Sequence, residues 1–346
     1  MHILVTGGTG FIGSHICSVL LRYNLSVTIF DSLINSSLGV VDRIKEINNQ
    51  KLNNINFIKG DIRNINHIEK VFYDAQYKRY PINAVIHCAG LKVLKDSLQN
   101  PLNYWDVNVS GTLNLLKIMK KYSCYSIVFS SSATVYDNNG FNLLDEKKAL
   151  KPINPYGHTK LTNENILSNL FHSSQKDWKI ANLRYFNPIG AHESGLIGEN
   201  PKGVPNNLFP YLSQVAMGKR NSLKVFGNDW PTKDGTCIRD FIHIMDLAEG
   251  HYAALEYLKN NKSNFININL GTGKGTSVLE LINAFSNANN CKINYSFDKR
   301  RDYDLPFVVA DNNFARKILN WEPTRGIEEM CRDGWNWQIT NPNGFL

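Results

Sequence analysis

The sequence predicts an α/β protein with a doubly wound parallel sheet, followed by a smaller, interleaved C-terminal α/β domain. A short apolar run at residues 2–6 leads through a glycine-rich turn at 7–13 into a segment with helical periodicity. Strand-like runs then alternate with helical segments through residue 185, which is typical of a parallel sheet covered by helices on both faces. A length of 346 residues allows about two domains.

The first turn indicates a dinucleotide site. Its glycines, Gly7, Gly10 and Gly13, let the backbone approach a pyrophosphate, and the following helix N-terminus favours negative charge. The second strand, 26–30, ends at Asp31, which is placed to bind ribose hydroxyls and would repel a 2′-phosphate. No Arg follows closely, so we expect NAD rather than NADP in a Rossmann-type domain. The alternative, a turn without a ligand, is disfavoured by the strand–turn–helix–strand context.

The later strands extend the same crevice. A strand at 55–58 precedes Asp61, which could bind an adenine amino group or, equally, cap the next helix. A strand at 84–87 precedes small residues across which a cofactor could lie, and a strand at 126–129 precedes the Ser-rich segment 130–136. Polar and glycine residues at or just after such strand ends should meet at one edge of the sheet; they are Gly10, Asp31, Asp61, Lys92, Ser132 and Tyr156.

Tyr156 and Lys160 are four residues apart in a segment that Pro155 suits as a first helical turn. On a helix both side chains lie on one face. An ammonium beside a phenol favours the phenolate, so we expect the pKa of Tyr156 to fall from about 10 towards neutrality. The alternative for the pair alone is an ordinary helix surface.

Composition excludes several classes of function. The net charge of +8 could indicate nucleic-acid binding, but the Lys and Arg are dispersed, and an enzyme for an anionic, phosphorylated substrate explains the charge equally well. No apolar stretch approaches the length of a membrane span, and because Met1 leads directly into the first strand we expect no secretory signal. The six cysteines are scattered, so we expect neither disulfides nor a metal site, and a cytoplasmic location.

Longer motifs carry a resemblance. The Gly7–Gly13 turn, Ser132 and the Tyr156–Lys160 pair resemble the extended, sugar-nucleotide form of the short-chain dehydrogenase/reductase superfamily. Nearly the whole chain, about residues 1–343, is similar to the UDP-glucose 4-epimerase family. The matching stretches are Cys88–Lys92, Ser130–Tyr136, Leu183–Pro188, Pro205–Leu208, Val225–Asp229, Asp234–Thr236, Arg239–His243, Arg300–Arg301 and Asp304–Pro306.

This resemblance implies inversion at C4 of the hexose in a UDP-sugar, through a 4-keto intermediate, with tightly bound NAD. Tyr156 would act as base and then as acid. Ser132 would hydrogen-bond the 4-oxygen, although it could instead only cap the segment after its strand. Lys160 would hold the nicotinamide ribose and, with the cationic nicotinamide, keep the phenol acidic.

The resemblance also implies two binding sets, and no metal. The residues expected around NAD are Gly7, Gly10, Phe11, Ile12, Gly13, Asp31, Asn35, Ser36, Asp61, Ile62, Cys88, Lys92, Tyr156, Lys160, Tyr185 and Phe186. The residues expected around the UDP-hexose are Ser132, Asn187, Asn207, Leu208, Lys224, Phe226, Arg239, Phe241, Arg301, Asp304 and Val308.

Four residues depart from the family pattern. Phe11 and Phe241 stand where Tyr is common, Val107 stands where an Asn is expected near the cofactor, and Asp137 replaces a usual Gly after the Ser132 segment. Val308 falls at the family's gate beside the sugar 2-substituent, where a small residue admits N-acetylated sugars. We therefore expect some activity on the UDP-N-acetylhexosamine pair, unless Val308 is only a β-branched strand residue.

Two alternative functions share this fold. A sugar-nucleotide 4,6-dehydratase needs an acid next to the Ser position, whereas Ser132 is followed by Ala133-Thr134-Val135. A non-enzymatic NAD-binding protein could dispense with the Tyr156–Lys160 pair, which this chain keeps.

The same resemblance suggests the organisation of the chain. We expect an NAD domain at 1–187, with return segments at about 240–270, and a substrate domain at 188–346. A late strand at 266–270 should rejoin the sheet. The family is usually homodimeric through helices that here would include 97–122 and 155–172.

Overall fold

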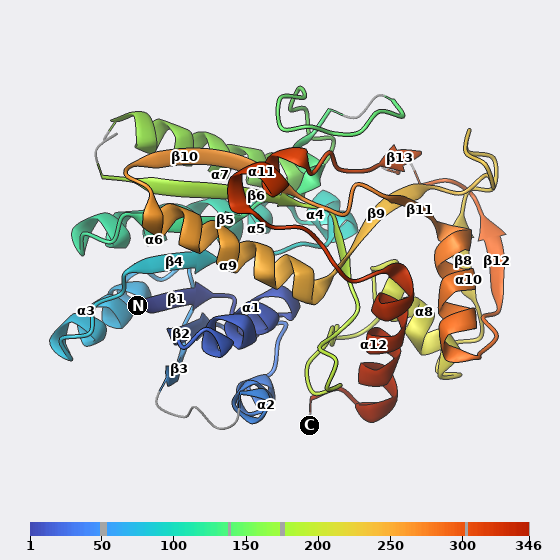
Figure 1. Cartoon of the computed structure of the whole chain (residues 1–346), viewed down its shortest axis with the longest axis horizontal. Coiled ribbons are helices and arrows are strands. Elements are labelled where there is room, and N and C mark those ends of the chain that lie inside the picture. Colours follow the sequence, from blue (N-terminus) through green and yellow to red (C-terminus); the bar gives the residue numbers. More distant parts are fainter. Residues whose placement is uncertain (49–53, 138–139, 174–176, 302–303, 346) are drawn as a thin grey trace.

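The computed structural model describes residues 1–48, 54–137, 140–173, 177–301 and 304–345, and its centre is a seven-stranded parallel sheet (Figure 1). The strand order is β10-β6-β5-β4-β1-β2-β3, so the order reverses beside β1. The strands are β1 (His2–Thr6), β2 (Ser26–Asp31), β3 (Ile55–Lys59), β4 (Ala84–His87), β5 (Ser126–Ser130), β6 (Lys179–Tyr185) and β10 (Asn264–Leu270).

The last strand of this sheet confirms the prediction of a late return. β10 pairs in parallel with β6, from Asn264 opposite Lys179 to Leu270 opposite Tyr185. All the other strands of this sheet come from the first 185 residues. The α/β class and the doubly wound parallel sheet are therefore confirmed, while the exact domain boundaries stay a prediction.

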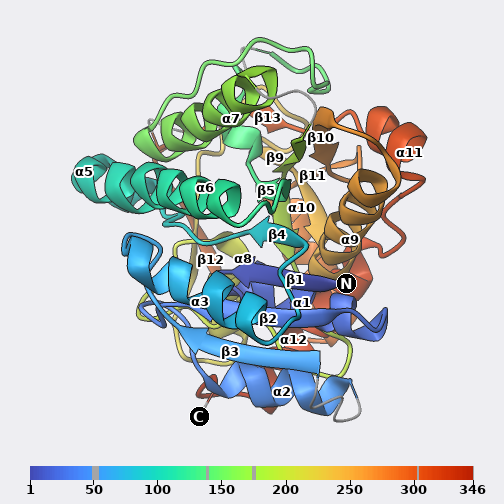
Figure 2. The ribbon, with the colours of Figure 1, turned by 90° about the vertical axis from the view of Figure 1, so that its left-hand side faces the viewer.

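Helices cover both faces of the sheet (Figure 2). Because successive strand residues face opposite ways, Ile3 and Val5 of β1 pack in one core and Leu4 in the other. One face carries α1 (Phe11–Arg22), α2 (Gly39–Ile47), α9 (Ile244–Asn260) and α11 (Asn313–Leu319). The other carries α3 (Ile65–Tyr77), α6 (Gly111–Lys121) and α7 (Pro155–Ser173).

The helix expected over 97–122 is wrong as a single element. The structure has α4 (Leu94–Gln99), α5 (Pro101–Tyr104), a π-helical turn at Trp105–Ser110 and then α6. Asn100 leaves helical geometry, and Pro101 cannot donate the backbone hydrogen bond that would continue α4. Pro101 instead occupies the first turn of α5, where a missing N–H is tolerated.

The C-terminal part lies at one end of the large sheet (Figure 1). It contains β7 (Asn187–Ile189), α8 (Leu208–Ala216), β8 (Leu223–Phe226), β9 (Ile238–His243), β11 (Gly275–Ser277), α10 (Val278–Asn289), β12 (Tyr295–Asp298), β13 (Phe307–Val308) and α12 (Ile327–Thr340). β9 is the centre of a small sheet with β7, β11 and β13, and β8 pairs with β12. Among the described residues, no helix has both the length and the apolar composition needed to cross a bilayer.

Candidate active site

The glycine turn between β1 and α1 is folded too tightly for side chains. Gly7 has a φ of +69°, which favours glycine. A Cβ at Gly7 would approach the Ala89 backbone nitrogen to 2.7 Å, and one at Gly13 would clash with the Gly7 carbonyl oxygen. Gly10 is the N-cap of α1, and within this described stretch no side chain caps the helix. The turn therefore fits a pyrophosphate held by backbone N–H groups at a helix N-terminus.

Asp31 joins this turn to the loop after β2. Its buried carboxylate accepts hydrogen bonds from the Thr9 N–H at 3.1 Å, the Leu33 N–H at 2.9 Å and the Ser36 hydroxyl at 3.0 Å. Asn35, next in the loop, is exposed. Asp31 thus shapes both loops in addition to standing at the strand end where a ribose is expected.

Asp61 does not cap α3, so that alternative is wrong. Asn64 is the N-cap, and its side chain accepts from the backbone N–H groups of Asn66 and His67. Arg63 instead binds the Asp61 carboxylate through Nε at 3.0 Å, and this hydrogen bond, against partial burial, lowers the pKa of Asp61. The neighbouring Ile62 is buried against the position of Gly111.

The loop after β4 brings Cys88 and Lys92 to the same crevice. The Cys88 thiol lies 3.2 Å from the Ser130 hydroxyl at the end of β5, and burial raises the pKa of this thiol to about 11. The Lys92 ammonium lies 6.0 Å from the centre of the Phe11 ring, in the first turn of α1. The adjoining Ile12 is partly buried against the same core as α1.

The candidate catalytic residues are together and buried. Tyr156 and Lys160 lie one turn apart at the start of α7, and Lys160 Nζ is 5.8 Å from the centre of the Tyr156 ring. Lys160 Nζ donates to the Ser130 carbonyl oxygen at 2.7 Å. A hydrogen bond links the Tyr156 and Ser132 side chains. Tyr185 is the last residue of β6, and Phe186 comes directly after it.

The expected fall in the pKa of Tyr156 is wrong for the protein chain by itself. Burial raises the pKa of Tyr156 to about 12, and the hydrogen bond to Ser132 only partly opposes this. Lys160 directs its ammonium to a backbone carbonyl. Burial also lowers the pKa of Lys160 to about 8, opposed by Cys88 and Glu164. Burial of both side chains therefore favours the neutral form of the Tyr156 phenol.

Ser132 both caps and faces the site. It is the N-cap of the short 3₁₀ turn Ala133–Val135 and accepts from the Thr134 N–H at 3.3 Å. The Thr134 hydroxyl donates to the same oxygen at 3.0 Å. The capping alternative therefore holds together with the contact to Tyr156, and Ser132 is held from both sides.

A buried ion pair behind this site was missed from the sequence. Arg184 of β6 and Glu164 of α7, each at most 4 % exposed, pair through Nη2 and Oε2 at 2.6 Å. Glu164 also accepts from the Ser131 hydroxyl at 2.5 Å, and Arg184 donates to the Tyr136 hydroxyl at 3.1 Å. Glu164 lies one turn after Lys160, which is the signal that could have suggested it.

On the substrate side, one carboxylate gathers two arginines. Arg301 binds Asp304 through two hydrogen bonds, at 2.7 and 2.9 Å, and Arg239 approaches Asp304 at 3.7 Å. Arg301 also lies over the Phe226 ring, 4.6 Å from its centre. Val308 pairs with Arg239 in the small sheet. Two guanidinium groups and one carboxylate leave a net positive charge suited to a diphosphate.

The remaining predicted substrate residues are less uniformly placed. Asn187 lies opposite Phe241 across β7 and β9, but the Phe241 ring is buried in the C-terminal core. Asn207 and Leu208 begin α8. The exposed Lys224 pairs with Asp298 at 2.8 Å. Only part of this set therefore converges on Arg239, Arg301 and Asp304.

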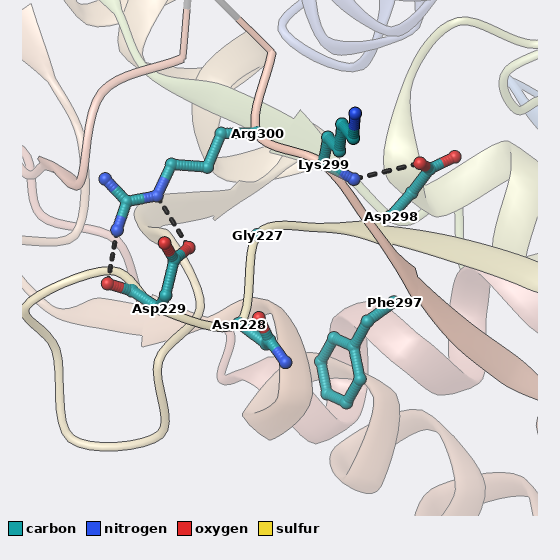
Figure 3. Close-up of a pocket in the computed structure, with 7 residues that line it drawn as sticks. All are labelled: Gly227, Asn228, Asp229, Phe297, Asp298, Lys299 and Arg300. Atoms are coloured by element: carbon teal, nitrogen blue, oxygen red, sulfur yellow. Dashed lines mark hydrogen bonds and ion pairs between the residues drawn. The ribbon is translucent and has the colours of Figure 1, made fainter.

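A hollow of about 550 Å³ lies between the segments 227–229 and 297–300 (Figure 3). Arg300 donates to the Asp229 carboxylate at 2.7 Å on one side of it. Its lining residues Gly227 and Arg300 are next to Phe226 and Arg301 in the sequence, and no predicted catalytic residue lines it. Its lining residues are Gly227, Asn228, Asp229, Phe297, Asp298, Lys299 and Arg300. Among the described residues, no group of His, Cys, Asp and Glu is arranged to hold a metal ion.

Comparison with known proteins places this geometry in a family. Residues 4–334 match a family model described as GDP-mannose 4,6 dehydratase. The bifunctional UDP-glucose and UDP-xylose 4-epimerase 3 of Arabidopsis thaliana is 49% identical, covering 99% of this chain and 97% of its own. The UDP-glucose 4-epimerase of Bacillus subtilis (strain 168) is 48% identical, covering 100% and 99%.

A solved structure agrees with these sequence relatives. The UDP-glucose 4-epimerase of Stenotrophomonas maltophila, with bound NAD and formylated UDP-arabinopyranose, superposes with a TM-score of 0.94. It is 42% identical, and the match covers 99% of each chain. The likeness extends along the whole chain, through the cofactor side and the substrate side alike. The chain therefore belongs to the family that the model describes and, within it, to the UDP-glucose 4-epimerases.

Proposed function

We propose that this protein interconverts UDP-glucose and UDP-galactose by inverting C4 of the hexose, with NAD as a tightly held cofactor. The observation that carries this proposal is the buried Tyr156, which is hydrogen-bonded to Ser132 and lies one helical turn from Lys160. The same chain has a glycine turn that fits a pyrophosphate and an arginine cluster that fits a diphosphate. The family relatives support the same reaction.

The cofactor side fits NAD. The Gly7–Gly13 turn would hold the pyrophosphate, Asp31 the adenine ribose, and Lys160 the nicotinamide ribose. Tyr185 and Phe186 would border the nicotinamide, and Asp61 with Ile62 would border the adenine. When bound, NAD supplies the group that takes the hydrogen of C4 and returns it to the opposite face.

The residues of the chain move the proton. Tyr156 would take the 4-hydroxyl proton onto its phenolate oxygen and later return it. For this the high pKa of Tyr156 must fall, and Lys160 together with a bound, oxidised nicotinamide would supply the positive charge that lowers it. Ser132, held by Thr134, would keep the 4-oxygen within reach of Tyr156. Arg239 and Arg301 would bind the diphosphate.

Product analysis distinguishes the two chemistries of this fold. A 4,6-dehydratase needs an acid near the reacting sugar, whereas the group held against Ser132 is the Thr134 hydroxyl. We expect purified protein given UDP-galactose to form UDP-glucose, identified by NMR of the hexose. A 4-keto-6-deoxy product would support the dehydratase instead, and no product in the presence of NAD would support a binding protein.

We expect Val308 to admit N-acetylated sugars. It is half-buried and packs beside the core that contains Val135 and Phe186, next to the catalytic segment. Val308→Tyr should lower kcat/KM for UDP-N-acetylgalactosamine about 10- to 200-fold relative to UDP-galactose, because the larger ring fills the space for the 2-substituent. Coupled assays on both substrates measure this ratio. If the wild-type enzyme does not turn over the N-acetylated pair, the prediction is wrong.

We propose a homodimer through helical segments that include 97–122 and 155–172. Leu102, Trp105, Val109 and Leu113 recur at helical spacing, and Leu102 is 82 % exposed. Leu102→Glu with Trp105→Glu should convert a dimer into a monomer, as measured by light scattering, because charge then faces a buried interface. Tyr77→Glu, at an exposed position on α3, is the matched control. A wild-type monomer at micromolar concentration would contradict the proposal.

A cytoplasmic location is part of the same proposal. All six cysteines lie among the described residues as free thiols, and most are buried. Free thiols are typical of a reducing compartment.

A further inference from the structure

One carboxylate joins the two sides of the crevice. Glu199 lies in the loop between β7 and α8, and its side chain is 12 % exposed. Its Oε1 accepts from Lys92 Nζ at 2.9 Å and from Asn207 Nδ2 at 3.0 Å. Lys92 belongs to the predicted cofactor set and Asn207 to the predicted substrate set.

The backbone of Glu199 is held by a contact with the helix α12. The Trp337 indole of α12 donates to the Glu199 carbonyl oxygen at 3.1 Å. The preceding Gly198 packs against the same indole ring and bridges to Ala191. The loop is also tethered three residues later, where Lys202 donates to the Ile34 carbonyl oxygen at 2.8 Å. The Glu199 carboxylate is therefore attached to a loop whose backbone is held by several contacts.

The position of Asn207 supports a specific role. Asn207 is the N-cap of α8, where an Asn side chain usually accepts from the first helical turn. In this described segment it makes no such bond, and its amide is turned to Glu199. The Asn207 side chain is therefore bound to Glu199 and does not cap α8.

Electrostatics point the same way. A carboxylate between two sites for phosphate-bearing groups repels both ligands unless it holds a cation in place. Lys92 is about half exposed at 47 %, so its ion pair with Glu199 contributes little to folding stability. We therefore infer that the ion pair acts mainly by fixing the position of the Lys92 ammonium.

We propose that Glu199 is a positioning residue that couples the cofactor side to the substrate side through Lys92 and Asn207. The proposal rests on the function proposed above. A ligand that binds Asn207 changes the hydrogen bond between Asn207 and Glu199. Because Glu199 also binds Lys92, this changes the position of Lys92 beside the cofactor. We expect UDP to strengthen NAD binding in this way and so to slow its exchange, and by reciprocity NAD should strengthen the binding of UDP.

The test measures exchange of bound NAD for isotopically labelled NAD, with and without UDP. In the wild type, UDP should slow this exchange about fivefold or more. Glu199→Ala should bring the effect of UDP below about twofold and raise KM for UDP-galactose about tenfold, with kcat within about twofold. Glu199→Gln keeps an acceptor for Asn207 but no charge for Lys92. It should therefore restore KM without restoring the effect of UDP on exchange.

Glu193→Ala is the matched control, because Glu193 is an exposed carboxylate of the same loop. It should behave as the wild type. If Glu199→Ala retains the full effect of UDP, the proposal is wrong. Should Glu199→Ala fail to fold, Lys92→Met must abolish the effect of UDP in its place, and a retained effect overturns the coupling. A wild type that holds NAD but shows no effect of UDP contradicts this inference alone, whereas a wild type without NAD contradicts the proposed function.

Discussion

Replacing Tyr156 by Phe is expected to lower kcat for UDP-galactose by about 10²- to 10⁴-fold, the usual contribution of a positioned acid–base group. The ring and its burial are kept, and only the hydroxyl that bonds Ser132 is lost. KM should change little, because the diphosphate is bound elsewhere, by Arg239 and Arg301. Steady-state kinetics on protein with a measured NAD content check this result.

The control is a second buried tyrosine of the same layer. Tyr104 is fully buried and donates its hydroxyl to the Val93 carbonyl oxygen at 2.7 Å, outside the proposed chemistry. Tyr104→Phe should keep kcat within a few-fold of the wild type. If Tyr156→Phe loses less than about tenfold in kcat at equal NAD content, Tyr156 is not the base.

Replacing Glu164 by Gln is expected to reduce the free energy of unfolding by about 3–5 kcal/mol. The Glu164–Arg184 pair is almost fully excluded from water, so a neutral amide leaves the Arg184 charge buried without a counter-charge. Burial lowers the pKa of Arg184, but the bonds to Glu164 outweigh burial and hold it above its ordinary value. Urea unfolding, followed by circular dichroism, measures the change.

Glu69 provides the matched comparison. It pairs with Lys121 at 2.5 Å on the surface, where an ion pair contributes only about 0–1 kcal/mol. Glu69→Gln should therefore leave the unfolding midpoint almost unchanged. The double change Glu164→Leu with Arg184→Leu should destabilise less than Glu164→Gln, because it removes both charges. Equal effects of Glu164→Gln and Glu69→Gln would refute the buried-pair argument.

The places of the glycine turn and of Asp31 in the fold were predictable from the sequence because their signals are local. The glycine turn lies within seven residues, and Asp31 follows the second strand directly. The correct placement of these groups requires only strand, turn and helix in order. Pro101 could also have predicted the break between α4 and α5, since Pro interrupts a helix ladder.

Contacts distant in sequence were not predictable in this way. Lys92 and Glu199 are 107 positions apart, and only the folded loop brings them to 2.9 Å. The predicted fall in the pKa of Tyr156 is wrong because burial, which the spacing to Lys160 does not reveal, is the dominant effect. The core position of Phe241 likewise follows from packing in the C-terminal part and not from its motif.

The most direct test of the account is to incubate the purified protein with UDP-galactose and no added nucleotide. We predict that UDP-glucose forms until both sugars reach equilibrium, and that denaturing the protein releases about one NAD per chain. Absence of UDP-glucose, together with NAD in the denatured sample, would contradict epimerisation by this site. Turnover that required added nucleotide in every cycle would contradict the retained cofactor.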